Sequence, residues 1–537
     1  MLFNSKIFVV FLMVVLSVYY GLSDRMKIWF LLIMSYVFYG FWDPKLCSLI
    51  LLSTVVDYWC GRKLGELPTS QRKSDGKPWL WASLAVNLGL LGFFKYHDFF
   101  VEEFVHALGW AGVTVDPQRY LLHLVLPVGI SFYTFQTMAY TIDMYRGDIE
   151  KPERDFVRFA LYVAFFPQLV AGPVERAPHL LPQFSRPFRL SKSMVREGIF
   201  LILLGFVKKV VIADRLARVI EPFFKVHAKD AVEAATAMLL FTCQIYVDFS
   251  SYSDIAIGLG LLLGYNIRPN FNLPFVVPSI PERWRRWHIS MSHWFRDYIF
   301  IPLGGSRKGK ARTQLNIMIV MFLSGLWHGA SNNFVMWGLL NGATMVGHKV
   351  LIRPLRFSSG LMERTTVTRV SYYYLCCWVT FCTIASINIF FRCPDWETAK
   401  SFARSIYWSG FGDYLAFFAI QLAWTRTYGM HLAGLSWCFW LTRPSAISMS
   451  VLEFFRAQNS GPSPASPPFG GSSTSGSRVL NSFTTSFNHA QSHPTTATTA
   501  FLGRNEGRRT PCSLVCCAGS GLVWGDGIHD RSGQLFC

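Results

Sequence analysis

The chain has 537 residues, of which 51% are hydrophobic and only 15% are charged, and its formal net charge is +19. Because soluble globular domains carry about 25% charged residues, this composition excludes an ordinary water-soluble enzyme. The lysines and arginines lie in short loops between apolar runs instead of one stripe with interleaved aromatic residues, which argues against a nucleic-acid partner. We expect anionic membrane lipid to be the partner of this positive charge.

Apolar runs recur along the chain at lengths close to the roughly 17 to 25 residues that a helix needs to cross a bilayer. They cover residues 6–22, 27–41, 47–60, 79–95, 121–142, 157–171, 199–222, 234–264, 314–329, 333–352, 371–391 and 413–440. None of them alternates as the strand of a membrane barrel does. We therefore predict an all-α fold, a polytopic transmembrane helical bundle with about ten to twelve spans.

The basic loops predict the orientation of this bundle. Arg25 and Lys27 follow the first run, and five basic residues lie in the loop 61–78. Under the positive-inside rule these loops and the basic loop 305–313 face the cytoplasm, so the N-terminus lies outside. The first run lacks a clear small-residue cleavage site, and a second run follows at once. We interpret it as a retained anchor rather than a signal peptide.

Two carboxylates interrupt the apolar stretch 241–265. Asp248 and Asp254 are six residues apart and on a helix point about 120° away from each other, which disfavours a carboxylate dyad. The hydroxyls of residues 250–253 predict a structural polar network, with a functional role as the alternative because charges at membrane depth are rare. Close packing against another helix is predicted for the glycines of this stretch, Gly258, Gly260 and Gly264.

The segment 281–305 is the most polar and aromatic part of the chain. Four of its residues recur at every fourth position and would line one face of a helix, namely Trp284, His288, Ser292 and Arg296. An aromatic ring, a base, a hydroxyl and a fixed cation on one face are typical of a catalytic site, and equally of an interfacial helix in an aromatic belt. The residues alone leave both interpretations open.

The same segment carries a second pair of residues and a basic surface. His293 and Asp297 are four residues apart, and we interpret them as an ordinary contact on a helix surface. Eight arginines and lysines lie between Glu282 and Arg312. They could attract an acidic donor such as coenzyme A, but anionic lipid would be attracted equally well.

His328 is the only titratable residue in the run 314–338. An imidazole at this depth is rare and can take a proton from a hydroxyl acceptor near neutral pH, which makes His328 the best single catalytic candidate. A neutral histidine that is hydrogen-bonded to a neighbouring helix is the structural alternative.

Five segments together resemble the alginate O-acetylase branch of the membrane-bound O-acyltransferase family. They are residues 127–147, 165–184, 246–275, 282–305 and 323–338, in the order expected for that family, and the resemblance covers roughly residues 1–410. There are two departures. Ser251 replaces a glycine of the family's Asp-Phe-Ser-Gly-Tyr-Ser-Asp motif, and His293 replaces a smaller or uncharged residue.

The resemblance implies an O-acetyltransferase of the bacterial inner membrane that uses acetyl-coenzyme A as a cytoplasmic donor, with no permanently bound cofactor. It also implies that His328, in a Trp-His-Gly motif, is the catalytic base, and that His288 positions the thioester or polarises its carbonyl. No metal is expected, since the 12 cysteines show no zinc-ligand spacing. The residues expected to support the histidines or to bind substrate are Trp284, Ser292, Arg296, Trp327, Asp248 and Asp254.

A periplasmic acetyltransferase is the implied partner, and alginate is the implied polymer, although similar proteins serve cellulose, peptidoglycan or teichoic acid. Two alternatives remain open. The chain could be a transporter or flippase that moves an acylated carrier without chemistry, because polar residues at the bilayer midplane suit that function too. It could also transfer D-alanyl groups to teichoic acid.

The composition of the chain changes after about residue 440. We predict that residues 1–440 form the transmembrane acyltransferase domain and that residues 441–537 form a low-complexity tail. The stretch 461–477, rich in glycine, proline and serine, cannot bury enough apolar surface to fold. Because the closing helices expected for the family are missing as well, we interpret the tail as the product of a shifted reading frame. A genuine disordered extension is the alternative.

Overall fold

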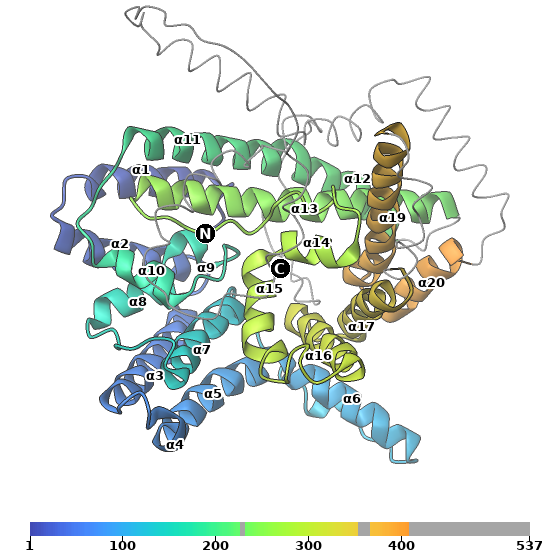
Figure 1. Cartoon of the computed structure of the whole chain (residues 1–537), viewed down its shortest axis with the longest axis horizontal. Coiled ribbons are helices and arrows are strands. Elements are labelled where there is room, and N and C mark those ends of the chain that lie inside the picture. Colours follow the sequence, from blue (N-terminus) through green and yellow to red (C-terminus); the bar gives the residue numbers. More distant parts are fainter. Residues whose placement is uncertain (226–230, 353–365, 408–537) are drawn as a thin grey trace, which may run out of the picture. The chain divides into compact units, whose positions relative to one another are not determined.

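The computed structural model describes residues 1–225, 231–352 and 366–407. Within these ranges the regular secondary structure is entirely helical, without a strand, which confirms the all-α prediction for this part of the chain (Figure 1). The predicted run 413–440 and the predicted tail 441–537 lie outside the described residues.

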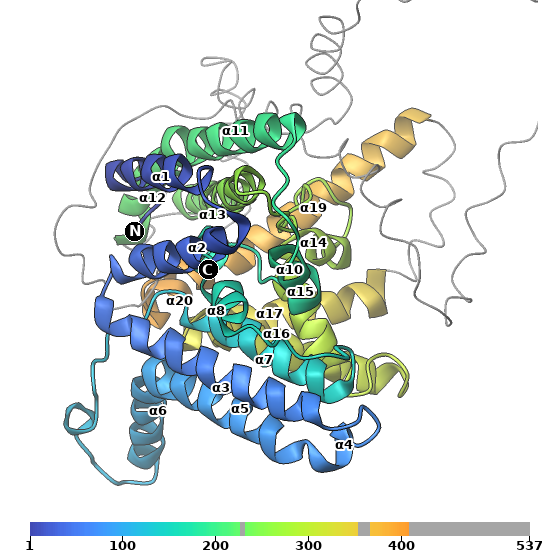
Figure 2. The same cartoon turned by 90° about the vertical axis from the view of Figure 1, so that its left-hand side faces the viewer.

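The helices of the first half follow one another closely along the chain (Figures 1 and 2). They are α1 (Lys6–Tyr19), α2 (Asp24–Gly40), α3 (Cys47–Glu66), α4 (Arg72–Asp75), α5 (Lys77–Leu91), α6 (His97–Trp110), α7 (Ile130–Arg146), α8 (Phe156–Ala164), α9 (Phe166–Leu169) and α10 (Ala177–Phe184).

The helices of the second half include the longest ones. They are α11 (Lys192–Phe206), α12 (Asp214–Lys225), α13 (Ala231–Leu262), α14 (Ile280–Arg286), α15 (Ile289–Phe295), α16 (Lys310–His328), α17 (Asn332–Gly347), α19 (Thr366–Arg392) and α20 (Trp396–Tyr407). Short π-helical turns extend four helices and cover Gly92–Tyr96, Val207–Ala213, Arg296–Phe300 and His348–Ile352.

Most predicted apolar runs coincide with a helix, and the differences have local causes. The run 121–142 becomes helical only at Ile130, after Gly129, whose φ of 77° lies in the left-handed region. The run 157–171 breaks at Phe165, next to Pro167 in the first turn of α9. Proline is tolerated in a first turn but lacks the amide hydrogen needed to continue a helix, so α8 and α9 are separate.

Two of the described helices are both long enough and apolar enough to cross a membrane by length and composition, Ala231–Leu262 and Thr368–Arg392. Shorter apolar helices cover Lys6–Tyr19 and Phe156–Leu169.

Apolar side chains face outward from several helices while polar ones face inward. On α1 the exposed residues include Val10 and Met13, 56% and 57% exposed. Between α3, α5 and α7, by contrast, the fully buried carboxylate of Asp57 accepts hydrogen bonds from Asn87 at 2.6 Å and from Thr141 at 2.7 Å. Polar groups inside and apolar groups outside are what helices surrounded by hydrocarbon require.

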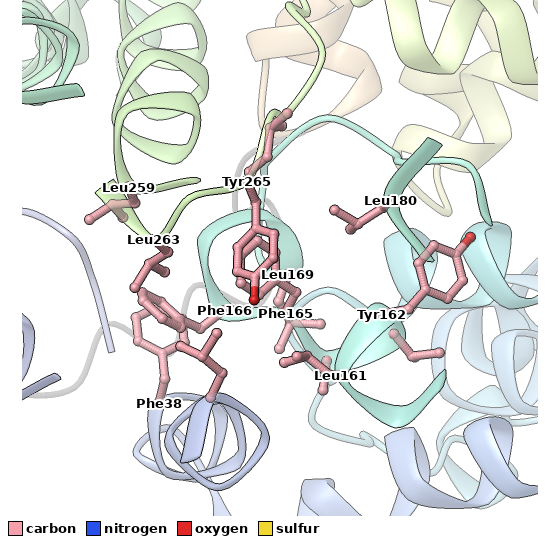
Figure 3. Close-up of a cluster of buried hydrophobic side chains, with 14 of the residues drawn as sticks. Phe38, Leu161, Tyr162, Phe165, Phe166, Leu169, Leu180, Leu259, Leu263 and Tyr265 are labelled. Atoms are coloured by element: carbon pink, nitrogen blue, oxygen red, sulfur yellow. The ribbon is translucent and has the colours of Figure 1, made fainter. Parts of the chain in front are cut away.

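One hydrophobic core joins α2, α8, α9 and the end of α13 (Figure 3). Figure 3 shows Phe165 and Phe166 at its centre, at the break between α8 and α9. The Phe166 ring lies 5.7 Å from the Phe38 ring, and the Phe165 ring lies 5.6 Å from the Tyr265 ring. At this break two consecutive phenylalanines contact different parts of the bundle.

Helices α11 and α13 lie side by side in both views (Figures 1 and 2). Their contact runs through glycines, because a Cβ atom added at Gly258 would lie 2.6 Å from the carbonyl oxygen of Gly198 on the other helix. This confirms the prediction of close helix packing for Gly258. Gly260 and Gly264 lie instead against loop residues, Ile267 and Phe188.

Candidate active site

The structure brings both His288 and His328 into contact with one tryptophan, Trp327. His328 is the last residue of α16, and His288 lies between α14 and α15. The Trp327 ring centroid lies 5.8 Å from that of His288 and 4.9 Å from that of His328. Segments that are 40 positions apart in the sequence therefore form one aromatic cluster around the two imidazoles.

The chain turns sharply at His288, which has a left-handed backbone with φ 43° and ψ 55°. For a residue other than glycine this conformation costs on the order of 1–3 kcal/mol and needs support from its surroundings. Asn270 supplies that support: its carbonyl oxygen accepts from the amide of Ile289 at 2.9 Å, and its Oδ1 accepts from the hydroxyl of Ser290 at 2.9 Å. Strain of this kind is common at functional sites.

The break at His288 corrects one prediction. Trp284, His288, Ser292 and Arg296 do not line one face of a continuous helix, because α14 ends at Arg286 and α15 begins at Ile289.

The other three residues of that set lie in different surroundings. Trp284 is buried, and its ring lies 6.0 Å from Trp337. The hydroxyl of Ser292 donates to the carbonyl of Trp287 at 3.1 Å. The exposed Arg296 pairs with Asp297 at 2.7 Å. Trp284 therefore belongs to the cluster around the histidines, whereas Arg296 belongs to the surface.

One hydrogen bond assigns the tautomer of His288. Its Nδ1 lies 3.2 Å from Oδ1 of Asn270, which also accepts from the amide and the hydroxyl of Ser290. Oδ1 is thus an acceptor, so Nδ1 carries the hydrogen and Nε2 carries the lone pair. Burial lowers the pKa of His288 to about 3, which keeps the ring neutral. Nε2 is buried and has no hydrogen-bond partner among the described residues.

His328 presents two unpaired nitrogens. Both Nδ1 and Nε2 are buried without a hydrogen-bond partner among the described residues. The ring packs between Trp337, at 5.0 Å, and Phe391, at 5.2 Å. The alternative drawn from the sequence, an imidazole hydrogen-bonded to a neighbouring helix, is not found in this part of the chain.

Lys95 and Tyr96 hold the end of α16. The Lys95 ammonium donates to the carbonyl of Trp327, and the Tyr96 hydroxyl donates to the carbonyl of Leu326 at 2.8 Å. A cation at a helix C-terminus is favourable because the last carbonyls lack partners within the helix. The backbone that carries His328 is therefore fixed from the π-helical turn after α5.

Arg283 is a buried cation of the same cluster, and its charge acts on the His328 ring. It is 1% exposed, and its guanidinium lies 4.5 Å from the Trp284 ring centroid and 4.3 Å from that of Trp287. Its Nε and Nη1 atoms have no hydrogen-bond partner among the described residues. Burial lowers the pKa of Arg283 to about 9, so the side chain still carries its positive charge at neutral pH.

The unpaired polar atoms of this region form a group. More than about 90% of buried polar groups in proteins have a hydrogen-bond partner, so several unpaired ones in one cluster indicate a place that receives a substrate. The group consists of Nε2 of His288, both ring nitrogens of His328, Nε1 of Trp284, Nε1 of Trp327, Nδ2 of Asn270, and Nε and Nη1 of Arg283.

Asp248 and Asp254 both pair with lysines. Lys209 lies 2.8 Å from Asp248, and Lys208 lies 2.7 Å from Asp254. The π-helical turn Val207–Ala213 directs these consecutive lysines toward α13. The hydroxyls that the sequence suggested contribute only weakly, through a contact of 3.4 Å between Lys208 and Ser250. A structural network based on ion pairs replaces the predicted network of hydroxyls.

The predicted pair of His293 and Asp297 is also corrected. His293 is exposed, and Asp297 pairs instead with Arg176 at 3.2 Å and with Arg296 at 2.7 Å. The π-helical turn that begins at Arg296 removes the regular i, i+4 spacing on which the prediction depended.

A cavity of about 810 Å³ lies between α17 and α19 and is almost entirely apolar. None of its lining residues is one of the two histidines, although Phe390, which lines it, neighbours Phe391 of the histidine cluster. The described residues contain no group of three or more His, Cys, Asp or Glu side chains that could hold a metal ion. An acidic cofactor or donor would meet the exposed basic residues of the turn after α15, such as Arg307 and Lys308.

Sequence reasoning missed Asn270, Arg283 and Lys95. Lys95 had a visible signal, since it is a charge at the end of the predicted span 79–95. Arg283 was counted with the basic surface, and only its burial distinguishes it from its exposed neighbour Arg285. Asn270 lies in a loop and has no distinguishing pattern.

Comparisons with known proteins agree with the geometry. Residues 49–391 match the model of the membrane-bound O-acyltransferase family. The chain is 42% identical over 353 residues to the probable alginate O-acetylase AlgI of Pseudomonas syringae, across 65% of this chain and 67% of that protein. It is 33% identical over 385 residues to the peptidoglycan O-acetyltransferase of Helicobacter pylori, across 67% and 69%.

A more distant relative is the teichoic acid D-alanyltransferase of Streptococcus thermophilus, 29% identical over 274 residues, across 48% of this chain and 65% of that protein. The family model covers more than half of the chain. The protein is therefore an acyltransferase and a member of the membrane-bound O-acyltransferase family.

Proposed function

We propose that this acyltransferase takes acetyl groups from acetyl-coenzyme A on the cytoplasmic side and passes them through the membrane for O-acetylation of an exported polysaccharide, with alginate as the first polymer to test. The observation that carries the proposal is the pair of buried imidazoles, His288 and His328, which have unpaired nitrogens and both contact Trp327. Two basic nitrogens in an enclosed cluster are suited to accept and position the proton of a hydroxyl.

In the proposed reaction His328 takes the proton of the acceptor hydroxyl while the acceptor oxygen attacks the thioester carbonyl. The imidazolium then returns the proton to the departing thiolate. His288 positions the thioester through contact with its ring, because the single hydrogen of the acceptor hydroxyl goes to His328 and the Nε2 lone pair of His288 can only accept. The hydrogen bond with Asn270 favours this positioning role over polarisation of the carbonyl, because a neutral ring whose only hydrogen points at Asn270 has none left to donate.

The other residues expected at the site have supporting roles in this proposal. Trp327 contacts both imidazoles, and Trp284 packs against Trp337, which contacts His328. Asp248 stabilises the bundle through its pair with Lys209. Ser292 fixes the turn that carries His288 by its bond to the carbonyl of Trp287.

The arrangement of the basic loops supports a donor site at one end of the bundle. Arg72, in the loop 61–78, donates to the carbonyls of Ile149 and Glu150 beyond the C-terminus of α7. Arg146, at that terminus, donates to the carbonyl of Asp297 at 3.0 Å. These contacts bring the two loops assigned to the cytoplasm toward the same end of the bundle. In Figure 2, α4, which belongs to the loop 61–78, and α6 lie at opposite ends of α5.

The histidines lie deep relative to that end. Helix α16 begins next to the basic turn and ends at His328, and its 19 residues span roughly 28 Å at 1.5 Å per residue. A site this far from the cytoplasmic end suits the transfer of an acyl group toward an acceptor on the other side. The outward-facing apolar residues of α1 and other helices support a multi-pass protein of the bacterial inner membrane.

The similar proteins suggest which partner and which polymer to propose. We infer that a periplasmic acetyltransferase receives the acetyl group, because the similar proteins are named for acetylation of alginate and of peptidoglycan. The D-alanyltransferase relative keeps D-alanyl transfer to teichoic acid as the second candidate.

Incubation of the purified protein with labelled acetyl-coenzyme A tests the chemistry. We expect release of free coenzyme A together with transfer of label to an added hydroxyl acceptor. A transporter of an acylated carrier would release no coenzyme A, and that result would contradict the proposal. Turnover only with a D-alanyl thioester would transfer support to the second candidate.

Cysteine labelling tests the orientation. Single cysteines at the exposed positions Ser70 and Ser306, in a background without native cysteines, should resist an impermeant thiol reagent added to intact cells. A cysteine at the exposed Thr114, in the connection after α6, should react. The reverse pattern would place the donor site outside and overturn the proposed direction.

A further inference from the structure

Arg283 carries a charge for which the described residues provide no counterion. Burial is the only influence on its pKa, and no carboxylate offsets it. The guanidinium lies over the rings of Trp284 and Trp287, which leave Nε and Nη1 without a hydrogen-bond acceptor. A buried cation is costly unless it is paired, so a persistent unpaired one points to a negative charge that arrives with the substrate or forms on it.

The position of Arg283 connects it to the histidines. Trp284, which stacks on the guanidinium, lies 6.0 Å from Trp337, and Trp337 lies 5.0 Å from His328. His288, Lys95 and Arg283 all act electrostatically on the His328 ring, and of these three only Lys95 and Arg283 are fixed cations. The Lys95 ammonium already donates to the carbonyl of Trp327. Arg283 is therefore the cation of the cluster whose donors remain available.

The single positive charge of Arg283 indicates which kind of anion it can neutralise. A diphosphate of coenzyme A carries about two negative charges, which a single buried guanidinium would leave partly uncompensated. The exposed basic residues after α15 are a better match for phosphates. A tetrahedral intermediate of acyl transfer carries a single negative charge on one oxygen, which one guanidinium can neutralise.

We propose that Arg283 binds the oxyanion that forms on the thioester carbonyl during acyl transfer. This inference rests on the proposed function. It assigns the electrophilic role to Arg283, because the hydrogen on Nδ1 of His288 is bound to Asn270. The interaction is stronger with the charged intermediate than with the neutral carbonyl, which is the condition for raising the rate instead of merely tightening binding.

The step balances as an acyl substitution. The acceptor oxygen forms a bond to the carbonyl carbon, its proton moves to His328, and the carbonyl π pair becomes the oxyanion held by Arg283. When that pair returns, the carbon–sulfur bond breaks, and the thiolate takes the proton from His328. The products are an ester and a free thiol, and Arg283 neither gains nor loses a proton.

The test separates turnover from donor binding. For Arg283→Gln we expect the rate of acetyl transfer to fall about 10²- to 10³-fold, as for loss of an oxyanion donor. The affinity for the dethia analogue of acetyl-coenzyme A, which keeps the phosphates but cannot be cleaved, should change little. Arg404→Gln, which removes an exposed arginine of α20, should keep both values. Unchanged turnover with weakened analogue binding would mean that Arg283 binds a permanent anion, and would overturn the inference.

A second variant covers the case in which Arg283→Gln does not fold. Arg283→Lys keeps the charge, and a buried lysine loses its proton at lower pH than arginine does. Its turnover should therefore fall as the pH rises through the lysine pKa, at a lower pH than in the unaltered protein, where the pKa of Arg283 is about 9. A profile whose alkaline limb coincides with that of the unaltered protein overturns the inference. If His328→Ala keeps full turnover, the proposed function itself fails, and if only Arg283 variants keep it, the inference alone fails.

Discussion

Nδ1 of His288 lies 3.2 Å from Oδ1 of Asn270, and this contact sets which nitrogen of the imidazole faces the cluster. The same asparagine holds the backbone after His288 through its carbonyl oxygen. One loop residue therefore fixes the position, the tautomer and the strained backbone of a proposed active-site residue.

The first prediction concerns this asparagine. Asn270→Ala should lower the rate of acetyl transfer by about 10- to 100-fold, the usual effect of removing a residue that orients an active-site imidazole. The matched control is Asn272→Ala in the same loop, which should stay near the unaltered rate. The measurement is turnover of labelled acetyl-coenzyme A by folded, purified protein. Equal rates for the two variants would show that the contact with Asn270 has no catalytic consequence.

The second prediction concerns Lys95. Lys95→Met removes the ammonium that holds the carbonyl of Trp327, so His328 should become mobile and transfer should fall at least about tenfold, since small misplacements at a reacting centre are costly. Lys192→Met, which removes an exposed lysine at the start of α11, serves as the control. Retention of full turnover in Lys95→Met would refute the positioning role.

The third prediction concerns the ion pairs between α13 and the π-helical turn Val207–Ala213. Asp248→Asn leaves Lys209 with Asp214, at 3.0 Å, as its remaining carboxylate partner, and should lower the free energy of unfolding by about 1.5–3 kcal/mol. Asp254→Asn should cost less, because the Asp254 side chain is 21% exposed whereas that of Asp248 is 7% exposed. Thermal unfolding in detergent measures both. Equal stabilities for the two variants would be inconsistent with the buried pair.

The fourth prediction concerns pH. Burial alone would raise the pKa of Glu175, but hydrogen bonds from His179 and Arg268 and their charges outweigh it and hold that pKa below the ordinary value. The stabilisation is therefore complete above the ordinary glutamate pKa of about 4.3 and is lost as the pH falls below it.

Glu175→Gln tests this linkage. The variant should be less stable than the unaltered protein at pH 7, and its stability should change less as the medium is acidified below about pH 4.3. Glu66→Gln, at a position that is 57% exposed, should follow the unaltered protein. The measurement is the thermal unfolding midpoint as a function of pH. Parallel acid limbs in Glu175→Gln and the unaltered protein would argue against the linkage.

The sequence predicted most helices because the length of an apolar run is a local property. It also singled out His288 and His328, and the structure brings these residues together around Trp327. Their catalytic roles remain predictions.

The features of the site that the sequence could not predict depend on contacts between distant segments. The left-handed turn at His288 is supported by a residue 18 positions earlier, Asn270, so helical periodicity alone suggested a continuous face. The lysine partners of Asp248 and Asp254 lie on a π-helical turn, and an apolar pattern does not predict the residue spacing of such a turn. Arg283 is buried against the rings of Trp284 and Trp287, and a count of basic residues cannot distinguish such a cation from surface charge.

The central claim is that the imidazole of His328 takes the proton of the acceptor, and the most direct measurement is acetyl transfer by purified histidine variants. His328→Ala should lose about 10²- to 10⁴-fold in rate, the usual effect of a lost general base, and His288→Ala should be nearly as impaired. His293→Ala, which removes an exposed imidazole of α15, should be mild. Full transfer by His328→Ala, or equal losses in all three variants, would contradict the account.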